Sequence, residues 1–207
     1  MTQPETIKSR ALRRADVLDD PFALFRLWFS EAASVQTILP EAMSIATVSA
    51  EGRPASRMVL LKELDEHGFI FYTNYNSRKA VNLDAVPFAA LLFWWPVLER
   101  QVRIEGSVEK VSAEDSDAYF ATRARGSQLG AWASDQSSPI DENELARRME
   151  AAEERFRDRD VPRPAHWGGY RVIPDQIEFW QGRPNRLHDR FRFVRVDGTW
   201  KVDRLAP

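Results

Sequence analysis

Short runs rich in apolar and β-branched residues recur along the chain between turn-forming segments, and this pattern predicts β-strands. Turn-forming segments separate the first of them, as at Ala50-Glu51-Gly52-Arg53-Pro54 and Asp65-Glu66-His67-Gly68. Short strands joined by tight turns favour an antiparallel meander or barrel over a doubly wound parallel sheet. The expected strands cover residues 43–48, 56–64, 69–74, 89–94 and 99–111, and, after a central helical region, 169–172, 176–181, 190–196 and 200–204.

Helical signals are fewer, and they flank the expected strands. Asp20 and Pro21 are suited to the N-cap and the first position of a helix. Residues 1–18 lack periodicity, so we expect a mobile arm there, followed by a single domain over residues 19–207. The predicted fold class is therefore mainly β with flanking helices (α+β). Further helices are expected at residues 77–83, 113–124 and 141–157.

The amino-acid composition excludes several classes of function. The 207 residues are 43% hydrophobic, enough for a substantial core, and a formal net charge of −2 argues against nucleic-acid binding. The absence of cysteine excludes disulfides and thiolate chemistry, and the three histidines lack metal-ligand spacing, so no metal is expected. The longest apolar run, residues 88–98, is too short to cross a bilayer, and the polar N-terminus lacks a signal-peptide core. We therefore expect a cytoplasmic protein without a membrane partner.

A first candidate site lies at Asn76-Ser77-Arg78-Lys79. Asn76 or Ser77 can cap a helix, which places Arg78 and Lys79 in its first turn. The helix dipole already favours negative groups there, so two cations at this position suit a bound phosphate. The alternative is a solvated basic turn.

A second candidate is Arg57-Met58-Val59-Leu60-Leu61-Lys62, where two cations bracket a strand that otherwise reads as core. Such cations either bind an anion or extend their charged ends to water, and this stretch alone favours the second reading. Alternation places the side chains on two faces, one with Arg57, Val59 and Leu61, the other with Met58, Leu60 and Lys62.

A third candidate combines Tyr119, Arg123 and Ser127. Tyr119 and Arg123 lie four residues apart on an expected helix, so they would face the same way and could hold a second phosphate. A simple surface pair is the alternative. The polar loop at residues 132–138 and Gln101 on an expected strand add hydrogen-bonding groups without indicating a specific role.

The densest cluster of binding groups is at residues 180–190, which hold Trp180, His188 and three arginines. In an extended segment Arg186, His188 and Arg190 would project to one side. Guanidinium groups bind phosphate or carboxylate and an indole stacks on flat rings, so this inventory suits a planar, anionic, aromatic ligand.

Taken together, these segments resemble the pyridoxamine 5′-phosphate oxidase family. The resemblance implies an FMN-binding split β-barrel that works as a homodimer, with active sites formed across the subunit interface. The matching segments run in family order: RMVLLK (57–62), FYTNYNSRKA (71–80), ERQVRIEG (99–106), SQLGAWASDQSS (127–138), WGGYRV (167–172), IEFWQG (177–182), RLHDR (186–190) and WKVDRLAP (200–207).

The resemblance also implies roles for individual residues. Arg186 and His188 would be catalytic, over the reactive end of the substrate ring. The substrate would contact Lys62, Tyr119, Arg123, Ser127, Arg186, Leu187 and His188. FMN would be held by Arg57, Met58, Val59, Leu60, Leu61, Lys62, Tyr72, Thr73, Arg78, Lys79, Gln101, Gln136, Ser137, Trp180 and Arg190.

The implied reaction is the oxidation of pyridoxamine or pyridoxine 5′-phosphate to pyridoxal 5′-phosphate, with O2 as acceptor, giving H2O2 and, from the amine, NH3. One departure from the family pattern is that residues 6–12 contain no tyrosine to cover the substrate. Arg13, Arg14 and Arg204 form either a secondary anion site or a solvated basic arm. The other readings are a related flavin oxidase for another aromatic acid, as in phenazine assembly, and a non-catalytic flavin or pyridoxal phosphate carrier.

Overall fold

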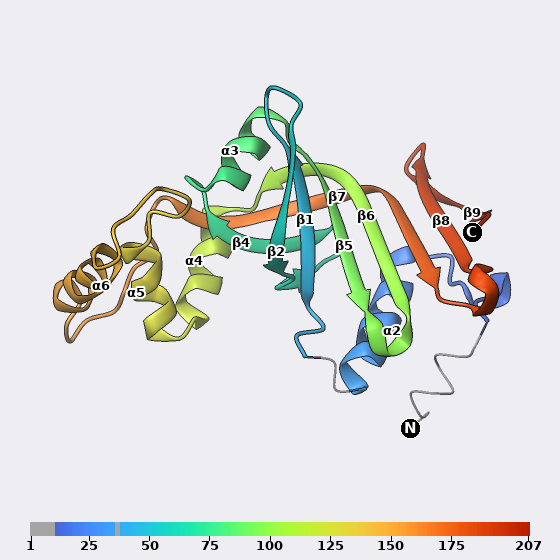
Figure 1. The fold of residues 1–207 in the computed structure, drawn as a ribbon, viewed down its shortest axis with the longest axis horizontal. Coiled ribbons are helices and arrows are strands. Elements are labelled where there is room, and N and C mark those ends of the chain that lie inside the picture. The colour runs from blue at the N-terminus through green and yellow to red at the C-terminus, as the bar shows by residue number, and fades with distance from the viewer. Residues whose placement is uncertain (1–10, 36–37) are drawn as a thin grey trace.

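One nine-stranded antiparallel sheet organises the part of the chain that the computed structural model describes, residues 11–35 and 38–207 (Figure 1). The strand order is β2-β1-β5-β6-β7-β4-β3, and β8 pairs with both β7 and β9. The predicted mainly β fold with flanking helices is confirmed. The strands are β1 (Ala42–Val48), β2 (Pro54–Leu60), β3 (Glu63–Leu64), β4 (Phe69–Asn74), β5 (Phe88–Trp95), β6 (Arg100–Lys110), β7 (Trp167–Gln181), β8 (Asp189–Val196) and β9 (Thr199–Leu205).

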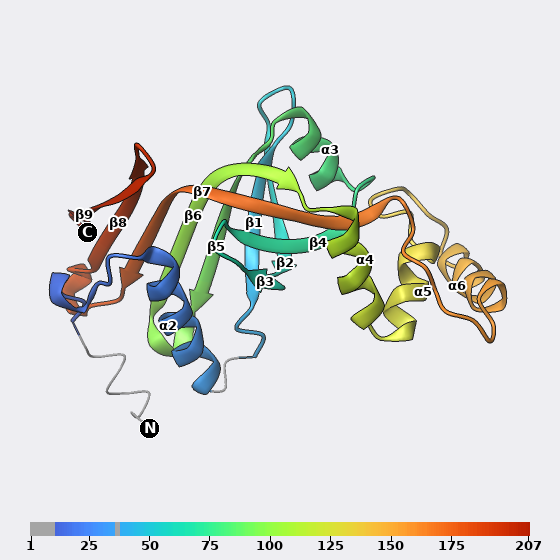
Figure 2. The ribbon, with the colours of Figure 1, turned by 180° about the vertical axis from the view of Figure 1, so that it is seen from behind.

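The long strand β7 connects the two ends of the molecule (Figure 2). Its first half pairs with β4, its second half pairs with β8, and β6 runs along most of its length. The sequence predicts two separate strands here, over residues 169–172 and 176–181. The strand continues because a register shift opposite Glu105 and Gly106 of β6 accommodates Pro174 and Asp175.

Helices lie at both ends of the sheet (Figure 1). Asp20 caps the first, accepting a hydrogen bond from the amide of Phe22 at 2.9 Å, with Pro21 in the first turn as predicted. In the described part of the chain, no helix has the length and apolar character needed to span a membrane. The helices are α2 (Pro21–Ser34), α3 (Arg78–Ala85), α4 (Ala113–Thr122), α5 (Arg125–Ala133) and α6 (Glu144–Arg155), with short 3₁₀ helices η1 (Arg14–Asp16), η2 (Pro96–Leu98) and η3 (Pro184–Arg186).

Two helical predictions need correction. The helix expected over residues 113–124 ends at Thr122, and Arg123 has extended backbone angles. A further helix, α5, follows at once, although the sequence shows no clear periodicity there; Gly126 and Gly130 weaken its local helical signal. Tyr119 and Arg123 therefore do not share a face of one helix, and Ser127 belongs to the next helix.

The core has two parts. The larger packs α2 against the sheet through side chains such as Phe25, Trp28 and Phe93, and the smaller joins α4, α5 and α6 to the start of β7. Leu12 and Val17 are buried in the larger part, and the amide of Leu12 donates to the carboxylate of Asp189 at 3.1 Å. Residues 11–18, expected to belong to a mobile arm, instead pack against the domain, and residues 1–10 of that arm lie outside the described residues.

The register shift on β6 generates a stability prediction. A Cβ atom at Gly106 would lie 1.9 Å from the carbonyl oxygen of Ile173, so Gly106→Ala forces two backbones apart. We expect a loss of about 1–3 kcal/mol in the free energy of unfolding, measured by denaturant titration. Gly130→Ala is the control, because nothing lies within 4 Å of its Cβ position in α5, and it should gain about 0.5–1 kcal/mol. Equal effects of the two changes would contradict the packing argument.

Candidate functional site

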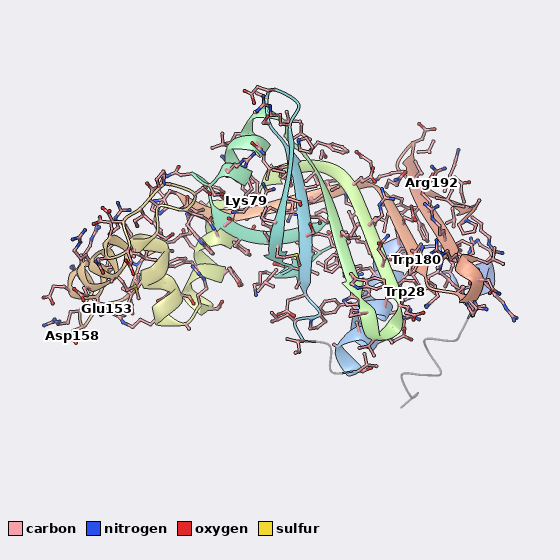
Figure 3. The ribbon with its side chains drawn as sticks, viewed as in Figure 1. Trp28, Lys79, Glu153, Asp158, Trp180 and Arg192 are labelled. Atoms are coloured by element: carbon pink, nitrogen blue, oxygen red, sulfur yellow. The ribbon has the colours of Figure 1, made fainter. Side chains whose placement is uncertain are left out.

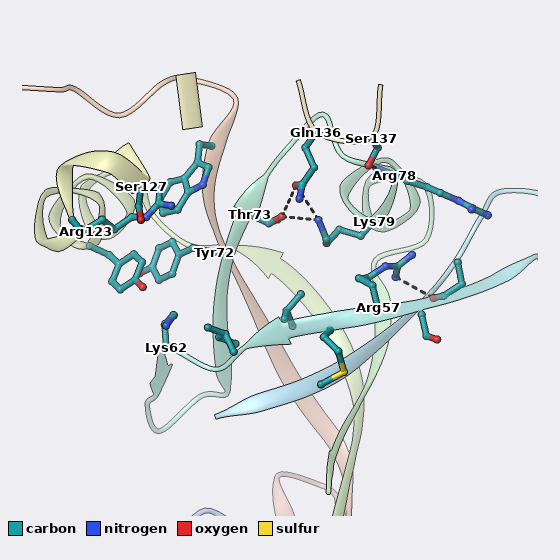
Figure 4. Close-up of a pocket in the computed structure, with 18 residues that line it drawn as sticks. Arg57, Lys62, Tyr72, Thr73, Arg78, Lys79, Arg123, Ser127, Gln136 and Ser137 are labelled. Carbon is teal, nitrogen blue, oxygen red and sulfur yellow. Dashed lines mark hydrogen bonds between the residues drawn. The ribbon is translucent and has the colours of Figure 1, made fainter. Parts of the chain in front are cut away.

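A cavity of about 890 Å³ opens beside β2 and β4, bounded by the start of α3, the α4–α5 connection and the loop after α5 (Figure 4). The sequence anticipates most of its lining, and Ala55, Ser56, Ala124 and Trp167 are additional. The predicted residues that the fold brings together here are Arg57, Met58, Val59, Leu60, Lys62, Tyr72, Thr73, Arg78, Lys79, Tyr119, Arg123, Ser127, Gln136 and Ser137.

Lys79 is the most buried cation of this cavity. Its ammonium donates to the hydroxyl oxygens of Thr73 at 2.8 Å and Ser77 at 3.0 Å, and to the amide oxygen of Gln136 at 3.1 Å. All three acceptors are neutral. Burial, aided by the charge of Arg57, lowers the pKa of Lys79 to about 8. The site therefore holds an ammonium whose charge the surrounding side chains solvate but do not neutralise.

Two more cations join Lys79 at this end of the cavity. A guanidinium nitrogen of Arg57 donates to the hydroxyl of Thr47 at 2.8 Å and the carbonyl of Ala55 at 3.0 Å. Burial, together with the charge of Arg78, lowers the pKa of Arg57. Arg78 begins α3, as the sequence predicts, with Ser77 at the N-cap. Among the described residues that line the cavity there is no carboxylate, so this end favours a compact anion such as phosphate.

An aromatic wall forms the other end. The rings of Tyr72 and Tyr119 are nearly parallel with centroids 4.0 Å apart, and the Trp167 ring lies 5.4 Å from that of Tyr72. Burial, reinforced by the negative charge of Glu63, raises the pKa of Tyr72 to about 12, so its phenol stays neutral at physiological pH. A flat apolar surface of this kind suits a planar ligand.

Arg123, from the candidate site for a second phosphate, lies along that wall. Its guanidinium carbon is 4.5 Å from the centre of the Trp167 ring, and its buried Nη1 has no hydrogen-bond partner. Burial lowers the pKa of Arg123. Ser127 and Lys62 line the same end, Lys62 from the break between β2 and β3 that interrupts the strand expected over residues 56–64. An unsatisfied buried donor beside a second cation points to an anionic ligand.

The remaining predicted residues lie elsewhere in the chain. Leu61 is buried in the core and does not line the cavity. Lys79 and Trp180 lie at separate ends of the sheet (Figure 3), and Gln101 faces Trp180 across the β6–β7 ladder. A single copy of the chain does not bring into the cavity Gln101, Trp180, Arg186, Leu187, His188 and Arg190.

The C-terminal cluster differs from the extended segment that the sequence suggests. Asn185 and Arg186 have left-handed backbone angles within η3, with φ of 59° and 61°, so Arg186, His188 and Arg190 do not alternate along one strand. The ring of His188 lies 4.5 Å from that of Trp180, and its Nδ1 accepts from the amide of Arg183 at 3.2 Å. Leu187 and His188 line a separate hollow with Arg204 and residues 205–207.

Several cations outside the cavity have carboxylate partners. Arg190 makes two hydrogen bonds to the buried carboxylate of Glu178, at 2.8 and 3.1 Å. In the candidate secondary anion site, Arg204 pairs with Asp189 at 2.8 Å, and Arg14 pairs with Asp19 at 2.7 Å. These pairings distinguish them from Lys79 and Arg123.

Trp167 is the main residue that our sequence reasoning missed, and a signal for it existed. Gly168 and Gly169 follow it on β7, and a Cβ at Gly169 would lie 2.8 Å from the ring of Tyr72. Two glycines within a strand often mark a close approach by another group. Here the nearest groups are the side chain of Val111, at 2.6 Å from that Cβ position, and the ring of Tyr72, which is opposite Gly169 in the β4–β7 register.

Comparisons with known proteins match both halves of the chain. Residues 31–158 match the family model described as pyridoxamine 5′-phosphate oxidase, and residues 167–207 match the pyridoxine 5′-phosphate oxidase C-terminal dimerisation region. A pyridoxine/pyridoxamine 5′-phosphate oxidase from Gloeothece citriformis (strain PCC 7424) is 57% identical over 198 residues, covering 95% of this chain and 92% of that protein.

Solved structures share the fold. PhzG from Burkholderia lata 383, in complex with tetrahydrophenazine-1-carboxylic acid, has a TM-score of 0.90 at 28% identity, covering 97% of this chain and all of that one. A pyridoxamine 5′-phosphate oxidase-related, FMN-binding protein from Nostoc punctiforme PCC 73102 has a TM-score of 0.74 at 18% identity. The match covers 91% of this chain and 98% of that one. With its split-barrel architecture and both family regions matched, the chain belongs to the pyridoxamine 5′-phosphate oxidase family.

Proposed function

We propose that the protein is an FMN-dependent oxidase that converts pyridoxamine and pyridoxine 5′-phosphates to pyridoxal 5′-phosphate. The observation that carries the proposal is a single cavity with two separate groups of cationic side chains and an aromatic wall at one end. FMN and the substrate each carry one phosphate and one flat ring, so together they require such a pair of subsites.

The chemistry of the lining fits FMN. Lys79, Arg57 and the first turn of α3 gather positive charge without a carboxylate, which suits the flavin phosphate. Thr73, Gln136 and Ser137 add neutral hydrogen-bonding groups. Bound FMN would supply the two-electron redox chemistry, while the protein orients the reacting rings.

The substrate phosphate belongs, on this proposal, at the other end of the cavity. Lys62, Tyr119, Arg123 and Ser127 would bind it, and the free Nη1 of Arg123 offers a donor that no protein group uses. Binding energy at the phosphate would then fix the position of C4′, the atom that is oxidised, because the substrate ring is rigid.

The overall reactions balance with O2 as the acceptor. Pyridoxamine phosphate, O2 and H2O give pyridoxal phosphate, NH3 and H2O2, whereas pyridoxine phosphate and O2 give pyridoxal phosphate and H2O2. Arg186 and His188 would orient the substrate, and a neutral His188 would receive the proton lost from its C4′ substituent.

A homodimer would complete the site. Arg186 and His188 lie away from the cavity in one chain, and the C-terminal region matches a family dimerisation region. An apolar strip on β2 and β5 exposes Met58 (63%) and Trp94 (48%), which suits a subunit interface. Two copies related by a two-fold axis would each supply the other's cavity with a C-terminal cluster.

The phenazine alternative is favoured by one observation, the fold similarity to PhzG, whose solved complex holds tetrahydrophenazine-1-carboxylic acid. At 28% identity this likeness is lower than the 57% shared with the pyridoxine/pyridoxamine 5′-phosphate oxidase. A carboxylate ligand could also use Arg123, so turnover has to decide between the two substrates.

Aerobic turnover of the FMN-loaded protein tests the proposal. We expect pyridoxal phosphate and H2O2 to appear in equal amounts from either B6 phosphate, with one NH3 per amine oxidised. Dihydrophenazine and tetrahydrophenazine carboxylic acids serve as the comparison substrates. Oxidation of these alone would replace the proposed function with the phenazine one, and no turnover of any substrate would indicate a flavin carrier.

Complementation tests the shared active site. Arg123→Gln and His188→Ala should each lower turnover by about 100-fold or more. Arg123→Gln removes a cation that would bind the substrate phosphate, and His188→Ala removes the proposed proton acceptor. If the two residues act on one substrate from different subunits, mixed dimers contain one intact site. Refolding the variants together should restore about a quarter of the wild-type activity, since half the dimers are mixed. Activity no higher than that of either variant would contradict a shared site.

The pKa of Lys79 predicts a pH dependence for cofactor binding. With only protein groups around it this pKa is about 8, and a neighbouring phosphate would raise it, so binding would take up a proton above pH 8. The FMN dissociation constant should therefore be flat from pH 7 to 8 and rise above it, by up to about tenfold per pH unit, in flavin fluorescence titrations. Riboflavin, which lacks the phosphate, is the control. Parallel profiles for the two flavins would show that Lys79 does not face the phosphate.

A further inference from the structure

Trp167 holds a place in the cavity that the proposed function leaves without a role. It begins β7 opposite Asn74, it is 7% exposed, and it lines the cavity. Its backbone is fixed on both sides, because its carbonyl accepts from Arg163 at 2.7 Å and its amide donates to the carbonyl of Pro164 at 3.0 Å. The ring of Phe120 packs edge-on against it at 5.1 Å. The indole is therefore a rigid part of the wall.

The indole is also the nearer of two rings beside the Arg123 guanidinium, whose carbon lies 4.5 Å from the Trp167 ring centre and 5.4 Å from that of Phe120. Two half-buried arginines elsewhere in the described chain pair with carboxylates: Arg163 with Asp117 at 2.6 Å, and Arg171 with Asp65 at 2.5 Å. Within the described residues Arg123 has no carboxylate partner, and its Nη1 is buried without a hydrogen bond.

The nature of the partner decides what Arg123 can do. A carboxylate would hold the guanidinium in place but would also cancel its charge and occupy its donors. An aromatic face attracts a cation through its quadrupole while the net charge stays at +1 and the in-plane N–H groups stay available. A ring thus fixes an arginine and leaves it able to bind an incoming anion.

We propose that Trp167 is the positioning residue of the substrate-anion subsite, holding Arg123 by a cation–π contact with its charge unneutralised, so that Trp167 sets the affinity for the phosphate of the ligand. This inference rests on the proposed function for the identity of that ligand. Trp167 acts through Arg123, and it determines affinity at the phosphate end of the substrate.

Ligand titration of the FMN-loaded protein tests the inference, with flavin absorbance as the signal. The two probes are pyridoxal 5′-phosphate and pyridoxal, which differ only in the phosphate. Trp167→Leu, which keeps apolar bulk but removes the aromatic face, should weaken pyridoxal phosphate binding roughly tenfold and weaken pyridoxal binding far less. Trp167→Phe keeps a smaller ring, so it should weaken pyridoxal phosphate binding only about threefold or less.

Trp132→Leu is the matched control for lost packing. Trp132 belongs to the same hydrophobic cluster as Trp167, and Arg155 lies 4.5 Å over its ring, but it does not line the cavity. This variant should lower thermal stability in a similar way while leaving the dissociation constant for pyridoxal phosphate as in the wild type. A comparable loss of phosphate affinity in Trp132→Leu would overturn the inference.

A double-mutant cycle separates positioning from bulk damage. In an Arg123→Gln background, Trp167→Leu should have no further effect on pyridoxal phosphate affinity, because no cation remains to be held. Additive losses, or equal losses for pyridoxal and pyridoxal phosphate, would overturn the inference. The same cycle can be run with inorganic phosphate as the probe. That version still tests the inference if the wild type oxidises no B6 phosphate. Failure of the proposed function is therefore distinguishable from failure of this inference.

Discussion

Positive charge held by neutral partners is the constraint that shapes this protein. Lys79 is surrounded by two hydroxyls and an amide oxygen, and Arg123 lies against an indole. Burying a cation without a counter-ion is costly, and the lowered pKa of Lys79 shows that cost. The surrounding strands and helices must therefore be stable enough on their own to hold these groups in place before any anion arrives.

Much of that stability comes from β7, which pairs with β6 and, at its two ends, with β4 and β8. One end of this strand carries Trp167 and the glycines that let Tyr72 lie flat, and the other end carries Trp180 beside His188. Because an extended strand of 15 residues is stiff and long, the two groups of candidate binding residues are kept apart within one chain. A second copy of the chain is the simplest way to unite them.

The sequence predicts the local elements better than their junctions. Apolar runs bounded by turn residues located most of the strands, and the Ser77-Arg78-Lys79 cluster was correctly placed at a helix start, because these signals are local. The break at Leu61-Lys62, the end of α4 before Arg123 and the left-handed turn at Asn185 depend on tertiary packing, so periodicity alone did not predict them. Most cavity residues were found through the family resemblance; Trp167 was not, because a tryptophan at a strand end usually reads as core.

The neutral hydrogen-bond acceptors around Lys79, on Thr73, Ser77 and Gln136, have a practical consequence for handling the protein. In the absence of a larger ligand, the cavity would bind small anions from the buffer through its buried ammonium and the nearby guanidinium groups. Phosphate and sulfate are compact oxyanions of the kind it attracts. Preparations in phosphate or ammonium sulfate would therefore carry these ions in place of a nucleotide, and the choice of buffer would alter every binding constant measured on them.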